Sequence, residues 1–110
     1  MSSRYIVYIT LTPKTPDLLE NVRRVMLDTR DMFLRMEGSI SHDVGVADGK
    51  VHVIETWVAD DSGADAERFE KTPEHDVMIQ SLLPLVTSDI VVVKLESVGA
   101  SRDSGRSSCV

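Results

Sequence analysis

The pattern of apolar and polar positions predicts a strand and then a long helix in the first third of the chain. Residues 5–11 are β-branched or aromatic and largely apolar on both faces, which is typical of a strand covered on both sides. Apolar residues then recur at helical spacing over residues 18–36. Thr15 stands at the expected N-cap with Pro16 at the first helical position, and Gly38 stands where a helix end favours a left-handed residue.

The next segment predicts a β-hairpin. Residues 39–46 and 51–58 are strand-like, and between them lies Asp48-Gly49, a dipeptide that is typical of tight hairpin turns. The polar run at residues 60–63 then breaks the strand pattern. We therefore expect two adjacent antiparallel strands followed by a turn.

Two short helices and a last strand are predicted after this break. The first helix is expected to end near Glu70, and the second to begin after Thr72 with Pro73 at its first position. Pro84 is expected to kink or end that helix, because proline lacks the backbone N–H that helix interiors need. Residues 89–98 are again apolar on both faces and predict the last strand.

This order of elements predicts an α+β fold of the ferredoxin-like, split βαβ type, with a four-stranded antiparallel sheet and helices on one face. The helices can cover only one face, yet the first and last strands are apolar on both. A second copy of the chain would cover the other face, so we expect a homodimer with stacked sheets. Residues 1–98 are expected to form a single domain, and the small polar residues 99–110 a disordered tail.

Composition narrows the function classes. The 110 residues include 18 acidic and 12 basic side chains, a net charge of −6, which disfavours nucleic acids and anionic membranes as partners. The one cysteine, Cys109, cannot form a disulfide within the chain. The first residues lack the features of a signal peptide, and no apolar run is long enough to span a membrane. We therefore expect a cytoplasmic protein.

Several segments together carry a family resemblance. They are the strand Val53-Ile54-Glu55-Thr56-Trp57, the later run Phe69-Glu70-Lys71-Thr72-Pro73-Glu74-His75, and the flanking Met36-Glu37-Gly38-Ser39 and Leu82-Leu83-Pro84-Leu85-Val86. In this order, over residues 5–98, they resemble the antibiotic biosynthesis monooxygenase superfamily. The resemblance implies a dimeric α+β barrel with a pocket between the sheet and the helices of each subunit.

The resemblance also implies a chemistry. The superfamily includes oxygenases that need no cofactor and convert aromatic polyketide anthrones or hydroquinones to quinones. In these enzymes a strand tryptophan and an asparagine four residues before it line the pocket. Trp57 matches the tryptophan, and Val53 occupies the asparagine position. The early-strand asparagine of the haem-degrading branch is also missing, so we expect neither haem nor another cofactor.

Two residues are candidate catalytic groups. His75 has an imidazole that could act as general base on a phenol, a role that a tyrosine could take instead, and Trp57 could form a flat wall against an aromatic ligand. The alternatives are a solvated histidine near a helix start and an ordinary core tryptophan. We expect substrate contacts from Trp57 and from the following residues: Glu55, Val53, Tyr8, Phe33 and Met78.

A histidine pair raises the question of a metal site. His42 and His52 lie on the two strands of the predicted hairpin and could sit close together, with Asp43 nearby. Two ligands do not make a site, and Asp43 should face away from His42. The sequence therefore favours structural histidines, and we expect no metal.

These observations leave three functions open. The first is an oxygenase of secondary metabolism that acts on a polycyclic aromatic or quinol-type substrate, with dioxygen as its second substrate. The second is a non-oxidative cyclase or isomerase of a biosynthetic intermediate, which needs only an apolar cavity and one base. The third is a ligand-binding module without chemistry, because a fold does not dictate a function.

Overall fold

The computed structural model describes residues 4–59 and 63–97 and contains four strands and three α-helices. In chain order the elements are β1 (Arg4–Leu11), the 3-10 turn η1 (Pro16–Leu18), α1 (Leu19–Leu34), β2 (Ser39–Ala47), β3 (Lys50–Val58), α2 (Ala64–Glu70), α3 (Pro73–Leu82) and β4 (Val91–Ser97). The predicted tail at residues 99–110 and most of the polar break at residues 60–63 lie outside the described residues.

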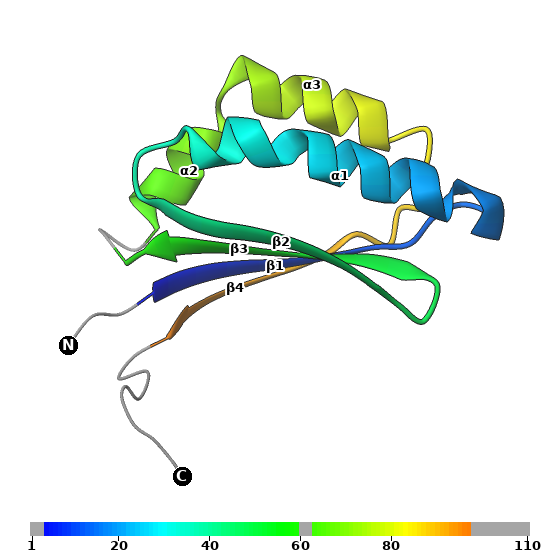
Figure 1. The fold of residues 1–110 in the computed structure, drawn as a ribbon, viewed down its shortest axis with the longest axis horizontal. Coiled ribbons are helices and arrows are strands. Elements are labelled where there is room, and N and C mark those ends of the chain that lie inside the picture. Colours follow the sequence, from blue (N-terminus) through cyan, green and yellow to red (C-terminus); the bar gives the residue numbers. More distant parts are fainter. Residues whose placement is uncertain (1–3, 60–62, 98–110) are drawn as a thin grey trace, which may run out of the picture.

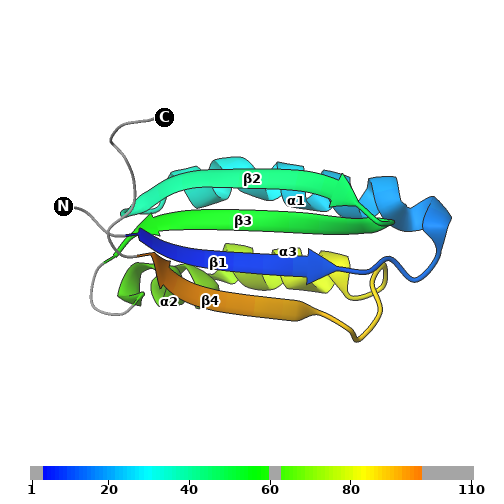
Figure 2. The ribbon, with the colours of Figure 1, turned by 90° about the horizontal axis from the view of Figure 1, so that it is seen from below.

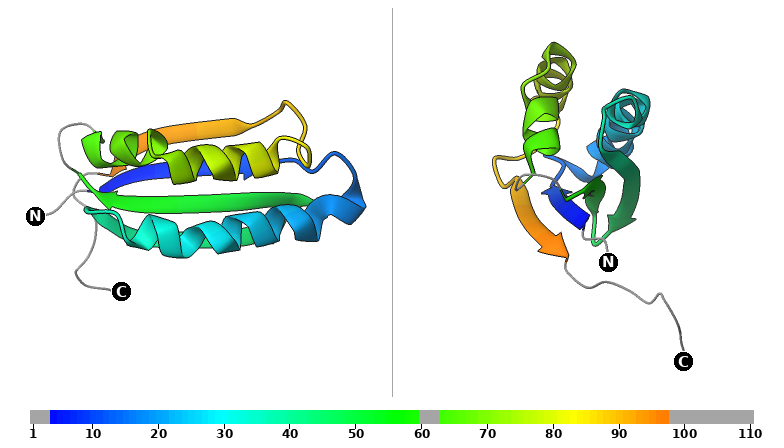
Figure 3. Two further views of the ribbon diagram at one scale, coloured as in Figure 1. Left: turned by 90° about the horizontal axis from the view of Figure 1, so that it is seen from above. Right: turned by 90° about the vertical axis from the view of Figure 1, so that its left-hand side faces the viewer.

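The strands form an antiparallel sheet in the order β2-β3-β1-β4. All three α-helices lie on one face of this sheet (Figures 1 and 3), and no helix of the described residues lies on the opposite face, which is seen from below in Figure 2. This arrangement confirms the predicted α+β, ferredoxin-like fold. None of the helices in the described part of the chain is both long enough and apolar enough to cross a membrane.

The hairpin between β2 and β3 forms as predicted, with a turn at Asp48 and Gly49. Both residues have positive φ angles, 56° and 71°, which match the right-handed twist of the strands. The register that follows places His42 opposite Glu55 and His52 opposite Gly45.

This register rules out the idea that the two histidines could sit close together. His42 shares the helix-covered face with Glu55, whereas His52 lies on the open face, where its Nδ1 is 2.9 Å from the Tyr8 hydroxyl. A two-residue turn pairs even positions of β2 with odd positions of β3. Two histidines at even positions therefore point to opposite faces.

Helix ends differ from the predictions by a few residues. The chain makes the turn η1 after Thr15, whose side chain makes no capping hydrogen bond to the described residues, and α1 ends at Leu34. Gly38 has the predicted left-handed backbone, with φ 87°. The second cap forms as expected: the backbone N–H of His75 donates to Thr72 Oγ1 at 3.1 Å, which ties the start of α3 to its cap.

The core between the sheet and the helices has two parts. The aromatic cluster lies near α2 and consists of Val7, Phe33, Trp57, Ala66 and Phe69. The aliphatic cluster lies near α3 and consists of Leu11, Val22, Met26, Val51, Val53, Met78, Leu82 and Val86. Glu55 stands on β3 between Val53 and Trp57, so this carboxyl lies where the two clusters meet.

Candidate active site

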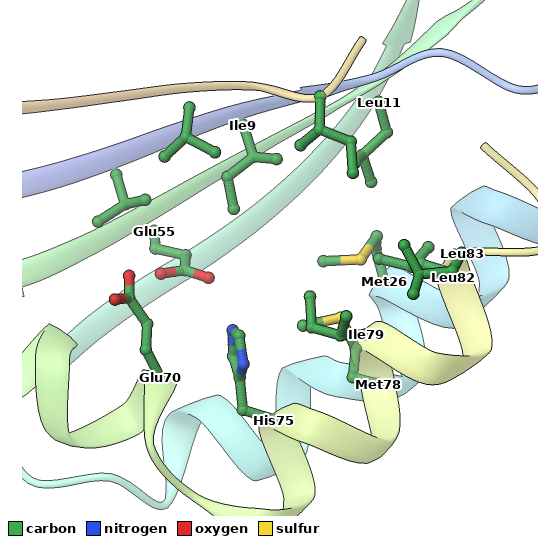
Figure 4. Close-up of a pocket in the computed structure, with 13 residues that line it drawn as sticks. Ile9, Leu11, Met26, Glu55, Glu70, His75, Met78, Ile79, Leu82 and Leu83 are labelled. Carbon is green, nitrogen blue, oxygen red and sulfur yellow. The ribbon is translucent and has the colours of Figure 1, made fainter. Parts of the chain in front are cut away.

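A cavity of about 140 Å³ lies between the sheet and α3. Most of its lining is aliphatic, and Figure 4 shows these side chains gathered from both layers. The lining residues are Val7, Ile9, Leu11, Met26, Glu55, Glu70, His75, Met78, Ile79, Leu82, Leu83, Ile90 and Val92. A mostly apolar space with a few polar groups has the composition that is usual for a ligand site.

The polar groups of the cavity are concentrated at one end. Glu55 lies on β3, Glu70 is the last residue of α2, and His75 lies in the first turn of α3. Their three side chains point toward one another (Figure 4). At the other end of the view lie Leu11 and Leu83, together with other aliphatic side chains. A ligand that fills this space therefore meets acid–base groups at one end and hydrocarbon at the other.

Glu55 is the most perturbed of these groups. Its side chain is on a residue with only 4% of its surface exposed, and burial raises its pKa to about 7. The Glu70 carboxylate raises this pKa further by repulsion, whereas the Trp57 indole N–H and the Lys94 ammonium lower it. The indole contact is weak, since Trp57 Nε1 makes no hydrogen bond of normal geometry within the described residues.

Glu70 and Lys94 form an ion pair at the edge of the cavity. Lys94 Nζ is 3.2 Å from Glu70 Oε1 and 3.0 Å from Oε2. Both side chains remain about one third exposed to solvent, so the pair contributes little to stability. The Glu70 carboxylate raises the pKa of Lys94, and Lys94 in turn offsets the negative charge of Glu70 beside Glu55.

His75 is held in place from two sides. Its backbone N–H is bound by the Thr72 cap, and its ring meets the Phe69 ring edge-on with centroids 5.1 Å apart. Burial lowers the pKa of His75, although the nearby Glu70 and Asp76 carboxylates oppose this. The ring is therefore mainly neutral at pH 7, and a neutral imidazole can both accept and donate a proton.

The structure brings some of the predicted site residues to the cavity and leaves others away from it. His75, Glu55 and Met78 line it. Trp57 and Phe33 are fully buried in the aromatic cluster, 4.6 Å apart by ring centroids.

The two remaining predicted contact residues also lie elsewhere. Val53 is fully buried in the aliphatic cluster. Tyr8 lies on the open face of the sheet, on the far side from the cavity, since its hydroxyl meets His52 there. The substrate-binding roles of Trp57, Phe33, Val53 and Tyr8 therefore stay predictions without a cavity contact behind them.

The sequence pattern alone does not identify Glu70 or Lys94 as part of the site. Glu70 is the last residue of α2 and Lys94 lies in the middle of β4, and nothing in their spacing along the chain relates these two elements. A signal for Glu70 did exist, because it lies in the same run as His75 and five residues before it. The cross-sheet row His42, Glu55, Val7 and Lys94, set by strand register, is what places the lysine beside the carboxylates.

Comparison with known proteins reveals similarity in fold. No protein-family model matches the chain, and no curated protein matches it. Among solved structures, a "putative antibiotic biosynthesis monooxygenase" from Deinococcus radiodurans superposes with a TM-score of 0.78 at 19% identity, over 92% of this chain and 99% of that one. One of the same description from Nitrosomonas europaea gives 0.77 at 13% identity, over 90% and 94%.

Other matched structures have names that assign no activity. A protein of unknown function from Nitrosomonas europaea superposes with a TM-score of 0.74 at 12% identity, over 94% of this chain and 97% of that one. At such identities the likeness shows the fold alone. The chain therefore has the fold of structures named antibiotic biosynthesis monooxygenases, as the sequence resemblance implied.

Proposed function

We propose that this protein is an enzyme of the antibiotic biosynthesis monooxygenase type, in which Glu55 removes a proton from a quinol-type aromatic substrate. The observation that carries the proposal is the position of Glu55: a carboxyl with a pKa of about 7 at the polar end of an apolar cavity. A base works best when its pKa lies near the working pH, and perturbed carboxyls in cavities are frequent catalytic groups.

His75 has a supporting role in this proposal. Its neutral ring lies beside the carboxyl and can pass the proton on or bind a second hydroxyl of the substrate. Trp57 packs behind the cavity against Phe33 and Phe69, and so supports the wall from which Glu55 projects rather than contacting the substrate.

The oxidation balances with dioxygen as the only co-substrate. After Glu55 takes the hydroxyl proton, the phenolate gives one electron to dioxygen, which leaves an aryloxyl radical and superoxide. These combine through a new carbon–oxygen bond, and the peroxide takes the proton back from Glu55. The carbon that carries the peroxide then loses its hydrogen as a proton, which goes to the departing hydroxide, and this carbon becomes a carbonyl. The O–O bond thus breaks with loss of water. The product holds one more oxygen and two fewer hydrogens than the substrate, so no external reductant is required.

Val53 favours a second candidate function. The resemblance places an asparagine at this position in the oxygenases, whereas Val53 is apolar, fully buried and not part of the cavity wall. Without that amide the cavity retains only the acid–base groups. These suffice for a proton-transfer rearrangement such as an isomerisation or cyclisation, which consumes no oxygen.

We also propose that the working form is a homodimer. The open face of the sheet carries large apolar side chains with 37–52% of their surface exposed: Tyr8, Ile54, Val58, Val91, Val93 and Leu95. A contiguous apolar face of this kind is usually covered by a partner. A second copy would cover it if the two sheets packed face to face about a two-fold axis. That symmetry would cover the same apolar face on both copies.

The test of the enzymatic proposal is oxygen uptake with hydroquinones as substrates, measured across pH. We expect kcat/KM to rise with pH through about 7, because only the deprotonated form of Glu55 accepts a proton. Glu55→Gln should lower turnover on the order of 100-fold or more while the protein stays folded. Glu70→Gln should retain activity and move the midpoint of the profile to lower pH, because one cause of the raised pKa is gone.

Two controls separate the alternatives. Product formation without oxygen uptake, and undiminished under nitrogen, would favour the rearrangement. Equal turnover by Glu55→Gln and the unmodified protein would remove Glu55 from the chemistry and overturn the proposal.

A further inference from the structure

The size of the cavity limits the ligand. Its volume is about 140 Å³, and an apolar protein cavity of about 150 Å³ holds one benzene molecule. A ligand of one aromatic ring with a short substituent therefore fills the space between Glu55 and the aliphatic end. A ligand of three fused rings would leave much of its apolar surface in water and gain little from that part.

The charge of the lining limits the ligand further. Among the described residues that line the cavity, Glu55, Glu70 and His75 are the ionisable ones, and none is a lysine or arginine. Lys94 is nearby, but both carboxylate oxygens of Glu70 already occupy it. An anionic ligand would thus lose its hydration and gain no cationic partner, which disfavours its binding.

A cationic ligand fits no better. The Glu70 carboxylate is paired with Lys94, and Glu55 is a buried acid that is at least half protonated up to neutral pH. The groups that remain are hydrogen-bond acceptors and donors: the Glu55 carboxyl and the neutral His75 ring. These suit a neutral hydroxyl, which can donate to one group and accept from the other.

From these two limits we infer that the ligand of this cavity is a neutral, single-ring aromatic compound with a hydroxyl group, such as a monocyclic phenol or hydroquinone. This inference rests on the proposed function, in which Glu55 and His75 act on a bound substrate, and it restricts the class of that substrate. It departs from the polycyclic substrates that the sequence resemblance implied.

Ile79 is the residue through which this size limit can be tested. It lies on α3, lines the cavity and is only half-buried, so its truncation should leave the protein folded. Val77 lies on the same helix two residues earlier, is 64% exposed and does not line the cavity. The two alanine variants therefore form a matched pair on one helix.

The test is a binding series on the full chain at pH 7, measured by titration calorimetry and ligand-observed NMR. The probes are 4-ethylphenol, ethylbenzene, 4-ethylbenzoate and 4-ethylbenzylamine for polarity, and 2-naphthol and 1-anthrol for size. We expect 4-ethylphenol to bind more tightly than each of the other five, on the order of tenfold against the charged probes and 1-anthrol. In Ile79→Ala the preference for 4-ethylphenol over 2-naphthol should shrink or reverse, and in Val77→Ala it should not change.

Tighter binding of 1-anthrol than of 4-ethylphenol would overturn the size limit. Tighter binding of the benzoate or the benzylamine would overturn the polarity of the site. An equal effect of Ile79→Ala and Val77→Ala would place binding outside the cavity and overturn the inference as well. Because binding is measured without turnover, selective phenol binding by a protein that does no chemistry would support this inference while contradicting the proposed function.

Discussion

The two faces of the sheet depart from the usual pattern in opposite ways. On the helix-covered face, polar side chains are buried: Glu55 is 4% exposed and His42 is 2% exposed, and neither imidazole nitrogen of His42 has a hydrogen-bond partner among the described residues. On the open face, apolar side chains are exposed, with Val93 at 44% and Val91 at 52%. Both arrangements cost free energy in an isolated subunit.

The difference indicates two separate causes. A buried carboxyl beside a cavity is destabilising by itself, and such a cost is common where a group with a shifted pKa is needed for chemistry. An exposed apolar face is destabilising only while nothing covers it, so its presence indicates that another protein surface packs against it. The covered face therefore carries the proposed reaction, and the open face carries the proposed dimer contact.

The largest expected effect comes from placing a charge on the open face. In Val93→Arg the guanidinium would lie inside the proposed interface, and a two-fold axis would bury it twice at several kcal/mol per charge. We expect the dimer to dissociate at micromolar concentration, as measured by sedimentation velocity. The unmodified chain should sediment as a dimer.

Val77→Arg is the matched control on the helical side, since Val77 is 64% exposed there. It should leave the mass unchanged. A monomeric unmodified chain would remove association as the reason for the apolar face.

The next effect concerns the loss of protein stability at high pH that the buried Glu55 on the covered face causes. The folded state holds the Glu55 proton up to about pH 7, whereas the unfolded chain releases it near 4.5, so stability falls as the pH rises between these values. Glu55→Gln removes this loss and should raise the free energy of unfolding by up to roughly 3 kcal/mol at pH 8. Urea unfolding at pH 4 and pH 8 measures the difference.

At pH 4 the carboxyl is protonated in both states, so the variant and the unmodified protein should there be nearly equal in stability. A gain of the same size at both pH values would mean that the substitution acts through packing rather than through the buried charge.

The smallest of the three effects concerns His42. Burial lowers its pKa, so the unfolded chain takes up a proton as the pH falls below about 6.5 while the folded protein resists it. The free energy of unfolding therefore falls as the pH drops below about 6.5. His42→Leu should raise the free energy of unfolding by about 1–2 kcal/mol at pH 8, because two unpaired nitrogens are removed, and by more at pH 5.

His42→Gln separates the two parts of this effect. It keeps a buried polar group but cannot titrate, so it should remove the acid-dependent part and leave the rest. A loss of stability in His42→Leu at both pH values would instead show that the contact with Phe33, at 5.1 Å between ring centroids, outweighs the unpaired nitrogens.

Sequence patterns were sufficient for the elements and, within β3, for the side of the sheet on which each residue lies. The alternation in β3 predicts that Glu55 and Trp57 share a face, and the register confirms it. Alternation cannot tell which of the two meets a cavity. That depends on what packs against each side chain. Trp57 packs against Phe33 and Phe69, whereas Glu55 borders the cavity between the sheet and α3.

The sequence by itself determined the order of strands and helices, the hairpin turn and the Thr72 cap of α3, because these follow from local backbone preferences and short-range periodicity. Only the tertiary structure decided which polar groups meet. Glu55, Glu70, His75 and Lys94 come from four different elements, and their distances depend on how helices pack on the sheet. The raised pKa of Glu55 has the same origin, since burial is a property of the packed layers and not of any one segment.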